Sequence, residues 1–155
     1  MSMFRSLVSL LLVLVSVLLV SCGGPAAQTP PPTYTPEIIT QLQVLSAPLE
    51  TARDRMTELA DYIEARDWVN IDNFIHGPLG EVRRDMSYVS RALLKKDRGE
   101  AANLSKSFFS HIERLDVAAK QQSDGQALPE FQQALQDLNT FLRLVPQPPE
   151  TPEAA

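Results

Sequence analysis

The sequence lacks most of the chemistry that enzymes and cofactor-binding proteins need. It has one cysteine and two histidines, so it carries no Cys-x-x-Cys-His haem motif and cannot form an internal disulfide. No Glu-x-x-His pair of the type found in di-iron helical bundles is present. It also lacks a nucleophile elbow, a phosphate-binding glycine loop and a zinc-protease motif. We therefore expect no catalytic residue, no enzymatic activity, no cofactor and no bound metal.

Basic residues are also too few for a nucleic-acid-binding protein. The chain has 14 Lys and Arg residues against 19 Asp and Glu residues, for a net charge of −5. Binding to DNA or RNA depends on neutralising phosphates with positive side chains. We therefore expect no nucleic-acid partner.

The single cysteine, Cys22, directly follows a long apolar run. Residues 7–20 are almost entirely Leu and Val, and Arg5 supplies a positive charge before them. A helix of this length reaches about 21 Å, which is shorter than a hydrocarbon core of roughly 30 Å. The run is therefore typical of an export signal, and Leu19-Val20-Ser21-Cys22 resembles the bacterial lipoprotein box. We predict that residues 1–21 are a lipoprotein signal peptide and that Cys22 is the lipid-attachment residue. Cleavage of an ordinary secretory signal near Ala26 is the alternative.

Prolines divide the rest of the chain. They are frequent in residues 22–36 and 146–155, where few large apolar residues accompany them. Such composition favours extended, semi-rigid chain over a packed fold. We predict a lipidated cysteine and Pro-rich linker over 22–36, one domain over 37–145, and a disordered Pro-rich tail over 146–155.

Residues 37–145 place apolar side chains at helical spacing in four segments. The first face contains Ile38, Leu42, Leu45, Leu49, Ala52, Met56, Leu59 and Ile63. The second contains Ile71, Ile75, Leu79, Val82, Met86, Val89 and Leu93. The third contains Ala101, Leu104, Phe108, Ile112, Leu115 and Ala119, and the fourth Leu128, Phe131, Leu135, Leu138, Leu142 and Val145. Because the connections are short and no strand-like alternation occurs, we predict an all-α fold, an antiparallel up-down-up-down four-helix bundle.

Several residues predict where these helices begin, bend and end. Pro48 removes a backbone hydrogen bond, so we expect a kink or short break near Ser46. Asp67 is a candidate N-cap for the second helix. Gly99 is expected to separate the second and third helices, and Pro129 to begin the fourth.

Two charged groups have alternative interpretations. His76 and His111 could meet and bind zinc, perhaps with Asp72, although two unrelated histidines are the simpler interpretation. A basic stripe on the second helix could steer the protein to an acidic partner, or could be a solvated face paired with neighbouring acids. Its members are Arg84, Arg91, Lys95 and Arg98.

The second helix is interrupted by Gly77 and Pro78, with Gly80 following closely. A proline inside a helix costs roughly 3 kcal/mol or more, so this break needs a reason. It could let the helix wrap around the bundle, or it could present a patch for docking.

The stretch from Asp67 to Met86, DWVNIDNFIHGPLGEVRRDM, resembles the second-helix signature of the PsbQ family. With a lipidated cysteine, the resemblance is to the cyanobacterial lipoprotein branch. It implies a non-catalytic extrinsic subunit of photosystem II, anchored by lipid on the lumenal side of the thylakoid membrane. Its partners would be the photosystem II core and other extrinsic subunits, and it would stabilise the oxygen-evolving complex and help retain calcium and chloride. The expected docking residues are Trp68, His76, Gly77, Pro78, Leu79, Arg83 and Arg84.

Two other functions remain open from the sequence. One is an exported lipoprotein that binds a metal or a small ligand in its bundle. The other is a general assembly adaptor of the cell envelope.

Overall fold

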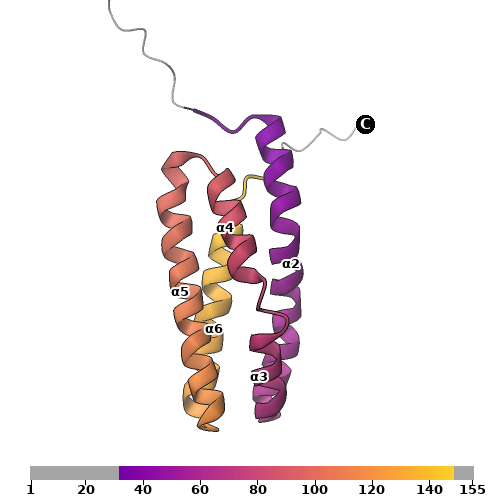
Figure 1. The fold of residues 1–155 in the computed structure, drawn as a ribbon, viewed down its shortest axis with the longest axis vertical. Coiled ribbons are helices and arrows are strands. Elements are labelled where there is room, and N and C mark those ends of the chain that lie inside the picture. The colour runs from indigo at the N-terminus through magenta and orange to yellow at the C-terminus, as the bar shows by residue number, and fades with distance from the viewer. Residues whose placement is uncertain (1–31, 149–155) are drawn as a thin grey trace, which may run out of the picture. The chain divides into compact units, whose positions relative to one another are not determined.

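The computed structural model describes residues 32–148, and this part of the chain is entirely helical. The helices are α2 (Pro36–Glu64), α3 (Trp68–His76), α4 (Val82–Ala92), α5 (Lys95–Lys120) and α6 (Asp124–Leu142), labelled as in Figure 1. Cys22, the predicted signal peptide and the last seven residues of the predicted tail lie outside the described residues. No helix within residues 32–148 is long and apolar enough to span a membrane.

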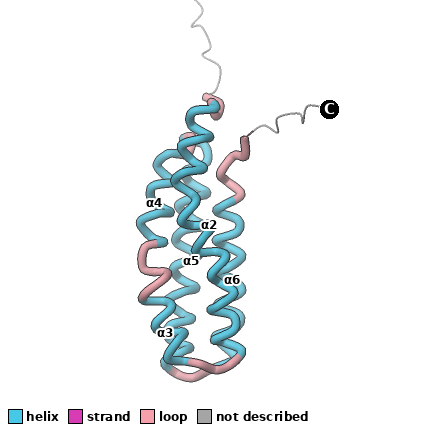
Figure 2. Tube along the Cα trace, turned by 90° about the vertical axis from the view of Figure 1, so that its right-hand side faces the viewer, coloured by secondary structure: helices cyan, strands magenta, loops and turns pink. Residues whose placement is uncertain are grey.

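The helices pack side by side in an elongated bundle. Figure 1 shows α3 and α4 end to end beside α2, with α5 and α6 completing the bundle. The turns that join α2 to α3 and α5 to α6 lie at the same end, as Figure 2 shows. The helix axes are therefore those of a four-membered bundle in which one member, α3 with α4, is interrupted.

The apolar faces predicted from the sequence form most of the core. All seven residues of the second face are buried, although they span the interruption between α3 and α4. The first and third faces are buried apart from the half-buried Ile38, Leu45 and Leu104. Helical spacing thus identified the packed side of α2, α3, α4 and α5.

Capping residues define the starts of α2 and α3. The Thr35 side chain accepts a hydrogen bond from the Ile38 N–H at 3.4 Å, and Pro36 occupies the first turn, where its missing N–H costs nothing. The Asp67 side chain accepts a hydrogen bond from the Asn70 N–H at 3.1 Å. The predicted capping role of Asp67 is confirmed.

The short break near Ser46, one of the two effects expected of Pro48, is wrong, whereas the kink stays a prediction. α2 continues through Pro48 without interruption, and Ser46 is buried within it. The Ser46 hydroxyl donates to the Gln43 carbonyl at 3.2 Å, so its polar group is satisfied inside the helix. Burial of Leu42 and Leu49 on either side favours a continuous helix enough to offset one missing backbone hydrogen bond.

Two other predicted boundaries are also wrong. Gly99 lies inside α5, and the chain turns earlier, where Leu93 and Leu94 have extended backbone angles. α6 begins at Asp124, so Pro129 lies inside the helix and does not start it. With this earlier start, Ala127 is buried and Leu128 is 47% exposed, which corrects the expected core position of Leu128.

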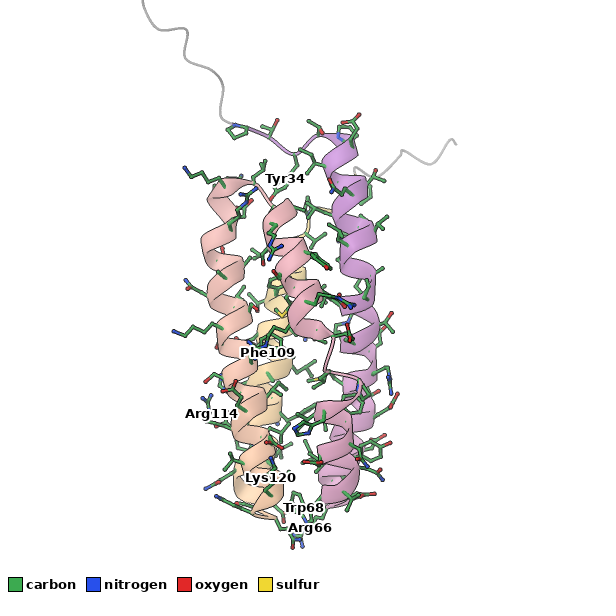
Figure 3. All side chains as sticks on the ribbon, in the orientation of Figure 1. Tyr34, Arg66, Trp68, Phe109, Arg114 and Lys120 are labelled. Atoms are coloured by element: carbon green, nitrogen blue, oxygen red, sulfur yellow. The ribbon has the colours of Figure 1, made fainter. Side chains whose placement is uncertain are left out.

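The turn between α4 and α5 is held by a residue from the predicted linker. The Tyr34 hydroxyl donates to the Asp97 carboxylate at 2.6 Å and accepts from the Leu94 N–H at 3.2 Å. Burial, followed by the hydrogen bond to Asp97, raises the pKa of Tyr34 to about 12. Figure 3 shows Tyr34 at the end of the bundle where α5 begins. The segment before α2 therefore contributes to the fold as far back as this tyrosine.

Candidate docking surface

The helix break closes with its own backbone hydrogen bonds. The Gly77 N–H donates to the Asn73 carbonyl at 2.8 Å, and the Leu79 N–H donates to the Phe74 carbonyl at 3.2 Å. The Gly80 N–H then donates to the Gly77 carbonyl at 2.9 Å. The break is therefore an ordered turn in which the backbone donors of these residues are paired.

The break also has a packing role. Leu79 is 3% exposed and Val82 is 2% exposed, so both side chains reach the core from opposite sides of the turn. His76, Gly77 and Gly80 face solvent. Leu79 was expected in the docking surface, but its side chain is not available to a partner because it packs inside the bundle. Pro78 is half-buried beside it.

The other expected docking residues do not form one compact patch. His76, Gly77 and Pro78 lie at the break, and Arg83 and Arg84 lie in the first turn of α4. Trp68 begins α3 and lies at the far end of the bundle, as Figure 3 shows. An α3 of this length separates Trp68 from the break by about 12 Å. Trp68 is half-buried and packs against the core.

Arg83 and Arg84 have different surroundings. The Arg83 guanidinium lies 3.8 Å from the centroid of the Phe109 ring, and its Nη2 lies 3.7 Å from Glu113 Oε1. Arg84 bonds Asp85 at 3.1 Å and also pairs with Glu81. The hydrogen bond to Asp85 raises the pKa of Arg84 above its ordinary value. Arg84 is thus partly neutralised within its own helix, whereas Arg83 stacks on α5.

The expectation that the basic stripe lies on one helix is wrong, because Arg84 and Arg91 belong to α4 whereas Lys95 and Arg98 belong to α5. Its other members are not neutralised as Arg84 is. Arg91 and Lys95 are exposed and form no ion pair with another residue of 32–148. The Arg98 side chain donates to the Leu93 carbonyl at 2.8 Å. The interpretation of a solvated face paired with neighbouring acids therefore holds for Arg84 but not for Arg91 or Lys95.

One carboxylate and histidine group has a geometry that could hold a metal ion. Ligand atoms of Asp72, His76 and Asp116 lie within 4.8 Å of one another. The Asp116 Oδ1 atom is buried and has no hydrogen-bond partner in the described structure, while Oδ2 accepts from Lys120 at 2.6 Å. Asp116 comes from α5, so the sequence pattern of α3 could not reveal it.

The structure does not bring the two histidines together. His111 Nδ1 lies 2.6 Å from Glu130 Oε2, and Nε2 lies 3.7 Å from Asp137 Oδ2. Arg114 also bonds Glu130 at 2.9 Å and holds the pKa of that carboxyl below its usual range, with His111 as a smaller cause. Each histidine has carboxylate partners of its own, which agrees with the simpler interpretation of two unrelated histidines and not with the alternative of a shared zinc site.

These features define a class of protein. The described part is a small all-helical bundle in which one member is interrupted and several arginines are exposed. The comparisons with known proteins agree with this class. The PsbQ family model, described as oxygen evolving enhancer protein 3, matches residues 3–146. CyanoQ from Synechocystis sp. (strain ATCC 27184 / PCC 6803 / Kazusa) is 49% identical over 148 residues, covering 95% of this chain and 99% of the relative. The chain belongs to the PsbQ family, in its cyanobacterial branch.

Proposed function

We propose that this protein is a non-catalytic extrinsic subunit of photosystem II on the lumenal side of the thylakoid membrane. The observation that carries the proposal is the family match over residues 3–146, together with 49% identity to CyanoQ along nearly the whole of both chains. Identity at that level over the whole length supports the same partner complex. The surface described above adds binding groups to that argument.

A lipid anchor on Cys22 is the second part of the proposal. The family match begins at residue 3 and so covers Cys22 and residues 3–21 of the predicted signal peptide. Each buried methylene of an acyl chain contributes about 0.8 kcal/mol, so two or three chains hold a protein at a membrane surface. A tethered subunit searches in two dimensions, which raises its effective concentration at a membrane complex without any new protein contact.

The proposed role is to stabilise the oxygen-evolving complex and to help retain its calcium and chloride. We infer an antiparallel up-down-up-down arrangement, in which α3 and α4 count as one interrupted helix. Such a bundle is a rigid cover that could limit access of solvent and reductant to the site beneath it. A rigid cover needs few ordering steps on binding, which lowers the entropic cost of association.

The proposed docking surface is the exposed side of the helix break with the start of α4. It comprises His76, Gly77, Pro78, Arg83 and Arg84, with Trp68 as a separate contact at the end of α3. Arginine is enriched at protein interfaces because its planar group both stacks and forms paired hydrogen bonds. The charged half of this surface can be tested by mutation, with a melting measurement as a check because Arg83 stacks on the core residue Phe109.

The direct experiment is affinity purification of a C-terminally tagged protein from its native membranes. We expect photosystem II subunits with the wild-type chain and a clear loss of them with the double substitution Arg83→Ala and Arg84→Ala. Arg143→Ala, at the residue that caps the end of α6, is the control, because Arg143 is also exposed and its side chain bonds only a neighbouring hydroxyl, Thr140 at 2.8 Å. Recovery of envelope machinery without photosystem II would instead support an assembly adaptor.

Two further measurements separate the anchor from the ion-retention role. Mass spectrometry of the mature N-terminus should find acylated Cys22, and Cys22→Ser should release the protein from washed membranes. Oxygen evolution by membranes that lack the protein should fall more steeply when calcium or chloride is withheld than it does in wild-type membranes. Equal ion dependence in the two membranes would remove the retention role and leave the docking role standing.

Metal binding is a second candidate function, and the Asp72, His76 and Asp116 group is the observation that favours it. A carboxylate and imidazole donor set suits zinc. The Lys120 ammonium competes for one oxygen of Asp116, so a bound cation would have to displace it or use the other oxygen.

A further inference from the structure

A groove runs along the surface between α4 and α5. Its volume is about 540 Å³, and four of the residues that line it are serines: Ser87, Ser90, Ser105 and Ser110. Arg83 and Lys106 are the positive residues of its lining. Neither helical pattern predicts this groove, because it forms where the small side chains of one helix face those of another.

The floor of the groove offers hydrogen-bonding groups. Ser90 donates to the Met86 carbonyl at 2.7 Å, and Ser110 accepts from Arg114 at 2.6 Å. Ser87 and Ser105 have no side-chain hydrogen bond to any residue of the described range. Each hydroxyl can both donate and accept, so two groups of the floor are free to bond the backbone of an incoming chain.

The charge of the groove is positive although the protein as a whole is acidic. Lys106 is exposed and has no ion-pair partner within residues 32–148. Lys95 lies eleven residues earlier on α5, which is three helical turns, so it extends the positive charge along the same face. The one acidic residue of the lining, Glu113, is engaged with Arg83. The net charge of the chain is −5, so this face contrasts with its surroundings.

The size and polarity of the groove select the kind of segment it can bind. From Ala102 to Glu113 the lining follows α5 over eleven helical steps, or about 16 Å. An extended chain rises about 3.3 Å per residue, so about five residues fill this length. The lining is mixed, because Ala102 and Phe109 lie beside the serines. The serine hydroxyls can bond the exposed backbone of an extended chain, and the Phe109 ring can contact its apolar atoms.

We propose that this groove binds an acidic, extended segment of about five residues from a neighbouring protein subunit. The proposal rests on the proposed function, because that function supplies a complex with neighbouring subunits. Positive side chains at the rim steer the acidic segment and set its direction, and the serines bond its backbone. Arg83 connects the groove to the docking surface at the helix break, since it lines one and belongs to the other.

The first test is cross-linking in native membranes. A photo-reactive benzoylphenylalanine at Ser105 of the full-length, tagged chain should cross-link to an acidic stretch of another photosystem II subunit. The same group in place of Arg53 on α2, a helix that does not line the groove, should not give this product. Cross-links from position 105 to the chain's own C-terminal segment, to lipid or to a helical segment would overturn the proposal.

The second test measures charge. Lys106→Glu should weaken association with photosystem II about tenfold or more, whereas Arg53→Glu, which makes the same change of charge on α2, should leave it within about twofold. Lys106 is exposed, whereas Arg53 is half-buried and pairs with Asp54 at 2.7 Å, so circular dichroism melting must show that both variants are folded. Equal association of the two variants would overturn the proposal while leaving the proposed function intact. Failure of the wild-type chain to co-purify would instead overturn the proposed function.

A peptide titration measures binding to the groove in the isolated protein, without photosystem II. Fluorescence anisotropy with a labelled Asp-Glu-Ser-Glu-Asp peptide should show binding to the wild-type protein that weakens with salt and weakens about tenfold with Lys106→Glu. A peptide of the same length with Lys in place of the acidic residues should not bind. Equal binding of the acidic and basic peptides would contradict the charge argument.

Discussion

Replacing Gly77 by alanine should destabilise the protein, and the reason is a close backbone approach. A Cβ atom built at Gly77 would lie 2.8 Å from the carbonyl oxygen of Asn73, the same oxygen that accepts the Gly77 N–H bond. An ordinary contact of this kind is at least about half an ångström longer, and neither backbone group can move without breaking the end of α3. We therefore expect Gly77→Ala to cost about 1–3 kcal/mol of unfolding free energy.

Two other glycines supply graded controls. A Cβ at Gly80 would lie 3.1 Å from the Gly77 carbonyl oxygen and 3.2 Å from that of His76, so a smaller loss of about 1 kcal/mol is expected. A Cβ at Gly99 would have no neighbour within 4 Å, and Gly99 lies within α5. Gly99→Ala should therefore stabilise the protein by about 0.5–1 kcal/mol, because alanine loses less backbone freedom in a helix.

Urea and thermal unfolding followed by circular dichroism measure this series. A change of 1 kcal/mol corresponds to a melting shift of about 4 °C for a domain of this size. The expected order of stability is Gly99→Ala, then wild type, then Gly80→Ala, then Gly77→Ala. If Gly77→Ala were as stable as wild type, the close approach would not be what requires glycine, and the turn would adapt at little cost.

Three further results are expected. Tyr34→Phe should lower the unfolding free energy by about 1–2 kcal/mol at pH 8. Because the pKa of Tyr34 is raised from 10.0 to about 12, the stabilisation by its hydroxyl is complete below pH 10 and is lost as the pH rises toward 12. Urea unfolding of the variant and the wild type should therefore converge near pH 12. Glu130→Gln should lower the free energy of unfolding by about 1 kcal/mol at pH 7. Because Arg114 lowers the pKa of Glu130, the stabilisation by the Glu130 carboxylate is present above the ordinary carboxyl pKa and disappears as the pH falls below that range. If the variant lost stability in acid as steeply as the wild type does, this reasoning would be contradicted. Zinc chloride should raise the melting temperature of the wild-type protein in a concentration-dependent way and should have a much smaller effect on His76→Ala; equal shifts would remove the Asp116 group as the binding site.

The spacing of apolar residues predicted the buried helical faces well, because these residues recur in the sequence with the period of the α-helix itself. Seven apolar residues from Ile71 to Leu93 keep one face although the helix breaks between them, and all of them are buried. The capping role of Asp67 was predictable for the same reason, since a cap bonds a backbone group three residues away. The family signature between Asp67 and Met86 also belongs to the sequence alone.

Helix boundaries were less predictable because glycine and proline signal only a local preference. Gly99 and Pro129 both lie inside helices, where packing of the neighbouring apolar residues outweighs that preference. The face of α6 that meets the core passes through Ala127, Phe131 and Ala134, so Leu128 is exposed. A displacement of one residue turns a helix by about 100°, which is enough to exchange a core position for a surface one.

The sequence by itself determined the apolar faces of α2 to α5, most of the face of α6, and the family. The export signal before Cys22 stays a prediction. The tertiary structure decided which side chains from different helices meet: Arg83 with Phe109, Asp116 with His76, and Tyr34 with the start of α5. Such pairs depend on how far each helix is rotated and shifted along its neighbour. Those quantities follow from the packing of the whole core, so no short stretch of sequence contains them.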